Sequence, residues 1–253
     1  MPSTNSPERV TSILKLPATA QSLFDHYSHL HIQGLEISCP YHINTALRGK
    51  RRALVGKGRP EEIEAAAEQY LARFQMLAHG NQEQLERYLM ACGLGVDCSG
   101  FAAWILNCVT LDAFHKPIQN CLKFPNLKRQ LVGKVRPFEN ISANLLTNHT
   151  NSVKISDINQ VRPGDLIRFI NGGHVVVVSE VGLDKRQQVA YFKYMQSSVG
   201  YGNRRGVEEN RVKVTNPAGY LLEQEWADKL LYQALVESSD DTRLTRLKAL
   251  YRP

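Results

Sequence analysis

Cys98 lies in the stretch VDCSGFAAWIL, where an aspartate precedes it and a Ser-Gly pair leads into an apolar run. This pattern predicts a helix that begins at the cysteine, with Asp97 or Ser99 as its N-cap. The positive end of a helix dipole stabilises a thiolate, and the first backbone amides can hold an oxyanion. The small Gly100 would let a substrate or a neighbouring strand approach. Cys98 is thus a candidate nucleophile for acyl chemistry, although an isolated cysteine is more often an inert core residue.

A histidine follows at the start of a predicted strand. The stretch FINGGHVVVV places Asn171-Gly172, a typical two-residue type I′ hairpin turn, between two strand patterns. This turn brings His174 to the first residues of its strand, near loops and any cleft, where an imidazole can exchange a proton with a thiol. The other histidines lack a motif context and are more simply surface or packing residues: His26, His29, His31, His42, His79, His115 and His149.

The stretches DCSGF, RPGDLIRF and GGHVVVV occur in an order that resembles the NlpC-like cell-wall cysteine peptidases, a family of the papain-like superfamily. The resemblance covers roughly residues 81–200. It implies that Cys98 is the nucleophile and that His174, at the start of a strand, is the base. The connection between the first two motifs is longer than is usual in the family, which would reshape the substrate groove.

The family also has a third polar residue on the next strand, and Gln196 in YMQSS is the best match to it. Its carbonyl oxygen would accept the Nδ1 proton of His174 and fix the tautomer without a buried negative charge. A solvated strand end is the plainer alternative for Gln196. The family's tyrosine that lines the site shortly before the cysteine is matched by Tyr88. The resemblance further implies substrate contacts from Asp97, Ser99 and Gly173.

The periodicity of the chain changes from helical to strand-like and back. Helices are predicted over residues 7–30, 60–80 and 81–93 and from Cys98 onward, and again over LLEQEWADKLLYQALV and DDTRLTRLKALY. Strands are predicted over DLIRFI, HVVVVSEV, QQVAYFKYMQSS and RVKVT, with a type II turn at RPGD. Helices followed by antiparallel strands predict an α+β domain.

Combined with the resemblance, this order implies a papain-like core in which the nucleophile helix packs on an antiparallel β-sheet. N- and C-terminal helical extensions flank that core. The chain then divides into a helical and basic N-terminal extension (1–59), a catalytic domain (60–216) and a C-terminal helical segment (217–253). Residues 110–160 are mixed and polar, and we interpret them as an insertion in the catalytic domain with short helices around 111–122 and 140–147.

Basic residues are concentrated in one segment. The chain carries a net charge of +7, and RGKRRALVGKGR, residues 48–59, holds six Lys or Arg and no acid. Such a segment suits an anionic polymer such as nucleic acid or cell wall, or an acidic lipid surface. A solvated loop is an equally good interpretation. Because no aromatic residues are interleaved, base stacking on single-stranded nucleic acid is not indicated.

The cysteines and the N-terminus bear on cofactors and on the compartment. The five cysteines have neither a disulfide framework nor zinc-ligand spacing, so no metal or other cofactor is expected. No apolar run approaches the ~20 residues that a transmembrane helix needs, and no secretory signal is visible. These features favour a cytoplasmic protein with reduced thiols, with export by a non-classical route as the alternative.

The resemblance implies a substrate class. The expected reaction is hydrolysis of amide bonds in peptidoglycan stem peptides, of the D-glutamyl–diamino acid type, through an acyl-enzyme. A muramoyl-alanine amidase or an acyltransferase would use the same Cys-His dyad, and both remain open. A fourth possibility is a non-catalytic module that binds an anionic polymer through residues 48–59.

Overall fold

The centre of the molecule is an antiparallel β-sheet. The computed structural model describes residues 10–43, 52–74, 81–169, 173–200, 206–238 and 243–251. The eight-stranded sheet has the order β4-β10-β5-β6-β7-β8-β9, and β1 pairs with β6 beside this path. Its strands are β1 (Ser12–Lys15), β4 (Ser152–Lys154), β5 (Leu166–Phe169), β6 (His174–Leu183), β7 (Val189–Ser198), β8 (Gly206–Lys213), β9 (Glu225–Trp226) and β10 (Arg243–Leu247). The paired strands are antiparallel throughout.

The remaining elements are helices and one small two-stranded sheet. The helices are α1 (Ala18–Ser28), α2 (Pro60–Arg73), α3 (Gln82–Ala91), α4 (Cys98–Phe114), α5 (Leu127–Val135), α6 (Ala143–Thr147) and α7 (Lys229–Glu237). Short 3-10 helices are η2 (Arg52–Val55), η3 (Ile118–Asn120), η4 (Phe138–Asn140), η5 (Ile158–Gln160) and η6 (Leu221–Glu223). The small sheet pairs β2 (Leu30–Ile32) with β3 (Leu35–Ile37). Helices with a mostly antiparallel sheet confirm the predicted α+β class.

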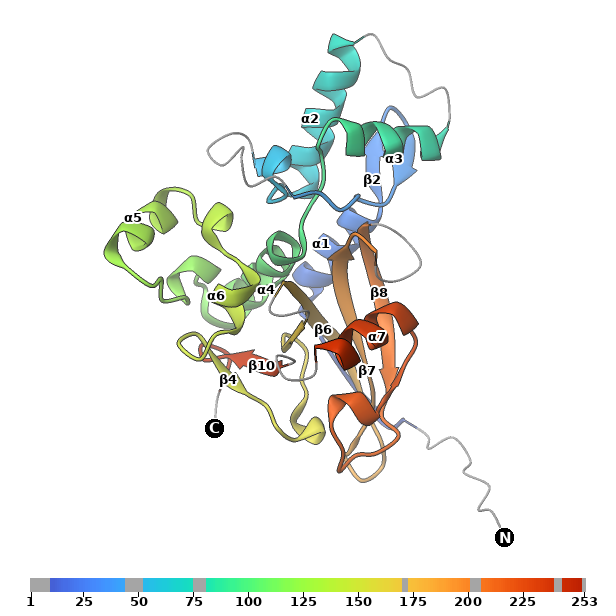
Figure 1. The fold of residues 1–253 in the computed structure, drawn as a ribbon, viewed down its shortest axis with the longest axis vertical. Helices are drawn as coiled ribbons and strands as arrows, with labels where there is room; N and C mark the ends of the chain where they lie inside the picture. Colours follow the sequence, from blue (N-terminus) through green and yellow to red (C-terminus); the bar gives the residue numbers. More distant parts are fainter. Residues whose placement is uncertain are drawn as a thin grey trace.

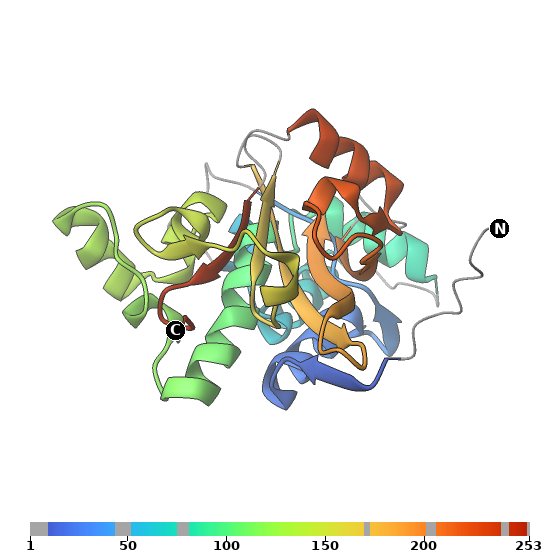
Figure 2. The ribbon, with the colours of Figure 1, turned by 90° about the horizontal axis from the view of Figure 1, so that it is seen from below.

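Helices cover both faces of the large sheet. Figures 1 and 2 show α1 and α4 on one face and α7 on the other, with α5 at the periphery. Along β6, Val175 and Val177 pack in the hydrophobic cluster with α1 and α4, whereas Val176 and Val178 pack in the cluster with α7. This alternation follows from the two-residue period of a strand, and it assigns each side chain near the start of β6 to one face.

Local sequence signals explain where α4 begins and ends. The Asp97 side chain accepts a hydrogen bond from the backbone N–H of Gly100 at 2.6 Å and so caps the helix. The helix ends at His115, whose φ of 54° is left-handed and ends the helical geometry. Because its first two turns are buried on every side, α4 is a central helix. Its predicted start at Cys98 is confirmed.

Several other sequence predictions are confirmed. Helices form over 60–73 and 82–91, and strands form at all four predicted stretches of the β half. The Pro-Gly turn at residues 162–165 closes with a bond from the Asp165 N–H to the Arg162 carbonyl, and Gly164 has the positive φ of 91° that a type II turn needs. The predicted hairpin turn at Asn171-Gly172 lies outside the described residues.

The two ends of the chain differ from the prediction. Instead of one helix over 7–30, the N-terminal part contains β1, which pairs with β6, followed by α1. The C-terminal helix predicted over DDTRLTRLKALY is wrong, because Arg243–Leu247 form β10 between β4 and β5. Arg246 in β10 is buried and donates to both carboxylate oxygens of Asp165, at 2.6 and 2.8 Å. Both ends therefore supply strands to the central sheet.

None of the helices within the described ranges is both long enough and apolar enough to cross a membrane.

Candidate active site

The chain that leads into α4 is held by backbone bonds on several sides. The N–H of Val96 donates to the carbonyl of Pro40 at 3.1 Å, and the N–H of Asp97 donates to the carbonyl of Gly56 at 2.9 Å. From the sheet, the Ser197 hydroxyl donates to the carbonyl of Val96 at 2.7 Å. Three distant parts of the sequence thus fix the position of the residue that follows, Cys98.

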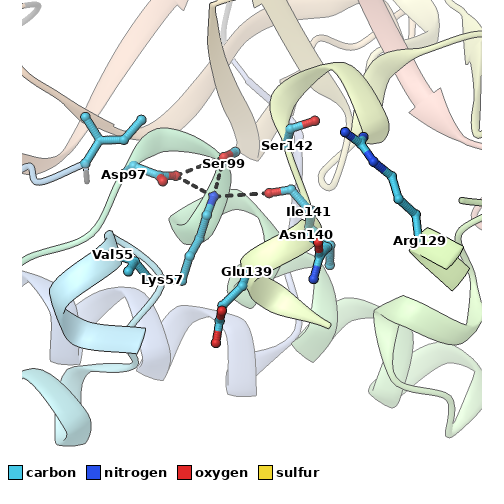
Figure 3. A pocket seen from close by; sticks show the side chains of 10 residues that line it. Val55, Lys57, Asp97, Ser99, Arg129, Glu139, Asn140, Ile141 and Ser142 are labelled. Atoms are coloured by element: carbon cyan, nitrogen blue, oxygen red, sulfur yellow. Dashed lines mark hydrogen bonds and ion pairs between the residues drawn. The ribbon is translucent and has the colours of Figure 1, made fainter. Parts of the chain in front are cut away.

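Lys57 is the polar centre beside this helix start. Its side chain is buried, and its Nζ donates to Asp97 Oδ1 at 2.8 Å, Ser99 Oγ at 2.5 Å and the Ile141 carbonyl at 3.1 Å (Figure 3). These three bonds use all the donors of an ammonium group. Asp97 and Ser99, which the resemblance assigned to substrate binding, are therefore bonded within the protein, on either side of the thiol.

The absence of a side chain at Gly100 permits this contact. A Cβ there would lie 2.4 Å from the Gly56 carbonyl oxygen and 2.9 Å from the Lys57 side chain. The close approach expected at Gly100 is thus made by the segment that carries Lys57. The sequence does not mark this lysine as part of a site, because it lies in a basic run typical of a solvated loop.

The Cys98 thiol lies against the backbone at the start of β6. Its Sγ is 3.8 Å from the Gly173 carbonyl oxygen, and the N–H groups of Val175 and Ser99 also interact with the sulfur. Burial raises the pKa of the thiol to about 12, and the Asp97 carboxylate adds to this effect. The Lys57 ammonium and the two N–H groups act in the opposite direction. The thiol is thus buried, neutral and in contact with the residues on both sides of His174.

The structure brings His174 and Gln196 together. His174 Nε2 lies 2.8 Å from Gln196 Oε1, and both side chains are buried. The Gln196 amide donates through its own Nε2 to Glu208 Oε1 at 2.8 Å and to Asp228 Oδ2 at 3.4 Å. Since these carboxylates can only accept when ionised, the amide oxygen must face the histidine, and His174 carries its proton on Nε2. The expectation that Gln196 binds Nδ1 is therefore wrong.

The imidazole stands on the α7 face of the sheet. By the strand period, His174 shares the face of Val176, and its ring lies 5.4 Å from the ring of Phe169. Burial lowers its pKa to about 4, and Gln196 and Asp228 act in the opposite direction. The Cys98 thiol lies against the backbone of Gly173 and Val175, the residues on either side of His174. The site at rest therefore holds a neutral thiol and a neutral imidazole.

Tyr41 is the tyrosine that interacts with Cys98, the candidate nucleophile. Burial raises the pKa of the Tyr41 phenol, and its interactions with Cys98 and Asp97 act in the same direction. Tyr41 also forms a parallel bridge with Val96, directly before the helix. Tyr88 lies in α3, where its phenol interacts with Cys92 and Tyr70. The sequence does not mark Tyr41, because 56 residues separate it from Cys98.

The described part of the basic segment is largely paired within the protein. Arg52 forms an ion pair with Glu62, and Arg59 forms one with Glu61 at 3.4 Å. Both guanidinium groups also lie over the ring of Trp104, at 5.4 and 5.3 Å. Residues 48–51 of the predicted polymer-binding segment lie outside the described residues.

The described part of the chain contains no group of three or more His, Cys, Asp or Glu side chains placed to hold a metal ion. No protein-family model, curated protein or solved structure matches this chain.

Proposed function

We propose that the protein is a cysteine peptidase that hydrolyses amide bonds through an acyl-enzyme at Cys98. The observation that carries the proposal is the contact between the Cys98 thiol and the backbone on both sides of His174, an imidazole whose tautomer is set by Gln196. A nucleophile, a base and a third group that orients the base are the parts that thiol catalysis requires.

In the mechanism that we propose, His174 carries each proton transfer of the reaction. As the Cys98 sulfur attacks the substrate carbonyl, Nδ1 of His174 takes the thiol proton, and Nε2–H stays bonded to Gln196. The first amides of α4 have no intrahelical acceptor, so the N–H of Cys98 is available for the developing oxyanion. His174 then protonates the amine nitrogen, the C–N bond breaks, and the amine departs, which leaves the acyl group bound to Cys98 as a thioester. In the second half, His174 activates the water that cleaves the thioester and returns the proton to the sulfur.

Burial disfavours both charged forms, so an ion pair between Cys98 and His174 is not the resting state we propose. The pKa of Cys98 lies above its ordinary value and that of His174 lies below it. Proton transfer then accompanies attack on the carbonyl, when the substrate carbonyl and the helix amides share the negative charge.

The proposed substrates are peptidoglycan stem peptides, cleaved at the bond between D-glutamate and a diamino acid. This choice rests on the resemblance of DCSGF, RPGDLIRF and GGHVVVV to the NlpC-like peptidases. A papain-like core is part of the same proposal, and it is supported by α4 packing on an antiparallel sheet that carries His174 and Gln196 on adjacent strands.

Digestion of purified muropeptides followed by mass spectrometry tests the function. We expect the parent protein to release fragments cut after D-glutamate, and we expect Cys98→Ala and His174→Ala to release none. Cys108→Ala, in the same helix, is the matched control and should cut like the parent. Retained cleavage in Cys98→Ala would overturn the assignment of the nucleophile.

The products also separate the alternatives. Cleavage between muramic acid and alanine would identify an amidase, and new amides formed from added amines would identify an acyltransferase. If no product forms and Cys98→Ala leaves salt-dependent binding to an anionic polymer unchanged, the chain is a binding module.

A further inference from the structure

A cavity of about 330 Å³ lies directly beside the start of α4. Asp97 and Ser99, the chain neighbours of Cys98, line its inner side together with Lys57 (Figure 3). The opposite wall is made by Arg129 of α5 and by residues 139–142, which belong to the insertion predicted at 110–160. The insertion therefore forms one side of a cavity whose other side contains both chain neighbours of Cys98.

The inner side of this cavity is neutral as a whole. Lys57 and Asp97 neutralise each other at 2.8 Å, and the remaining donors of Lys57 are bonded to Ser99 and Ile141. Because the ammonium is fully used, it offers no donor to a ligand. Any recognition of charge in the cavity must come from the wall that the insertion supplies.

That wall presents a cation and a hydroxyl. Figure 3 shows the Arg129 guanidinium extending toward Ser142, whereas the Glu139 carboxylate points the other way. The Ser142 hydroxyl accepts a bond from the Leu145 N–H and keeps its own proton to donate. A guanidinium beside a hydroxyl donor matches a carboxylate, which it can bind with two parallel N–H bonds.

The rest of the lining limits the shape of the ligand. Ile43 and Val55 add apolar side chains to the cavity. Its volume lies at the small end of the roughly 300–1,000 Å³ found for small-molecule sites. A short aliphatic residue that ends in a carboxylate fits this combination, whereas a bulky or cationic group does not.

We propose that this cavity is a substrate subsite and that Arg129 binds a free carboxylate of the peptide next to the amide bond that is cleaved. The inference rests on the proposed function for its substrate class. It makes the insertion a specificity element, in which α5 carries the residue that selects acidic peptides.

The test compares two peptides that differ only in that carboxylate. The probes are L-alanyl-γ-D-glutamyl-L-lysine and the same tripeptide with the α-carboxylate of its D-glutamyl residue converted to a carboxamide. Their binding is measured by calorimetry on Cys98→Ala, which cannot turn over the peptide. Loss of one charge-assisted hydrogen bond costs about 1.5–3 kcal/mol of binding free energy. Adding Arg129→Gln to Cys98→Ala should therefore lower the affinity for the acidic peptide about tenfold or more. The amidated peptide should bind with equal affinity to Cys98→Ala and to the double variant that also carries Arg129→Gln.

Arg136→Gln is the matched control, because Arg136 follows α5, is exposed and does not line this cavity. It should leave both affinities unchanged. The subsite proposal would be overturned if the two peptides bound Cys98→Ala with equal affinity. It would also be overturned if Arg129→Gln lowered the affinity for both peptides by the same factor. Carboxylate-dependent binding through Arg129 without cleavage by the parent protein would reject the proposed function and leave the subsite standing.

Discussion

The imidazole of His174, the proposed base, is oriented by Gln196, and two carboxylates hold Gln196 in turn. Gln196 accepts from His174 through Oε1 only because its Nε2 donates to Glu208 and Asp228. If the amide turned over, its NH₂ group would face the Nε2–H of the histidine, and two donors would oppose each other. Glu208 and Asp228 are thus positioning residues: they fix the amide, and the amide fixes the tautomer.

We expect Glu208→Gln to lower kcat about tenfold with little change in KM, because one charge-assisted hydrogen bond that orients Gln196 is lost. Nitrogen NMR of His174 should show a mixture of tautomers in the variant and mainly Nε2–H in the parent. Glu209→Gln is the control, since Glu209 is the next residue of β8 and binds Ser179 and Lys193. An unchanged tautomer in Glu208→Gln would reject the positioning role.

Three elements that are distant in sequence meet at Lys57. The segment after η2 carries the lysine, α4 supplies Asp97 and Ser99, and the turn after η4 supplies the Ile141 carbonyl. Trp104 of α4 reinforces the same junction, because its Nε1 donates to the Lys57 carbonyl at 2.9 Å. Its ring also stacks on Phe138. The position of the helix start therefore depends on contacts between elements as well as on its own cap.

Lys57→Met should lower the free energy of unfolding by about 3–5 kcal/mol, because it leaves the buried Asp97 carboxylate without its cation. Urea unfolding followed by circular dichroism measures this change. Lys193→Met is the control: Lys193 is partly exposed and pairs with Glu180 and Glu209, so its loss should cost at most about 1 kcal/mol. Equal midpoints for Lys57→Met and the parent would contradict a structural role for the pair.

At the scale of the whole molecule, the central sheet joins the two ends of the chain. The strand β1 pairs with β6 near the N-terminus, and β10 lies between β4 and β5 near the C-terminus. His174 begins β6 and is buried within this sheet, so unfolding of the sheet exposes it to water. The protonation of His174 is therefore coupled to the stability of the whole molecule.

This coupling predicts acid sensitivity. The pKa of His174 is about 4 in the folded protein and near 6.5 in the unfolded chain, so between these values only the unfolded chain binds the proton. Stability must then fall as the pH falls, and from pH 7 to 4.5 the contribution of His174 amounts to about 2.5 kcal/mol. Urea unfolding at both pH values should show that His174→Gln removes this part of the pH dependence.

His149→Gln is the control, because His149 is exposed and should leave the difference between the two pH values unchanged. A parent protein and a His174→Gln variant with the same pH dependence would contradict the buried, neutral imidazole.

The sequence by itself determined on which helix or strand, and at which end of it, the candidate catalytic side chains lie. A cap, a glycine and an apolar run place Cys98 at the start of a helix, and a run of β-branched residues after a turn places His174 at the start of a strand. The position of Gln196 on the next strand follows in the same way from the β-branched and aromatic residues before it. These features depend on residues a few positions away, so local patterns are enough to predict them.

Only the tertiary structure decided how these groups are partnered. In the fold, Gln196 binds Nε2 of His174, Lys57 forms an ion pair with Asp97, 40 residues away in sequence, and Arg246 forms one with Asp165, 81 residues away. The fold also places Tyr41 at the site, where the sequence suggested a tyrosine nearer to the cysteine. Each of these contacts depends on the packing of distant elements around buried polar groups. Local sequence patterns do not predict which elements pack against each other.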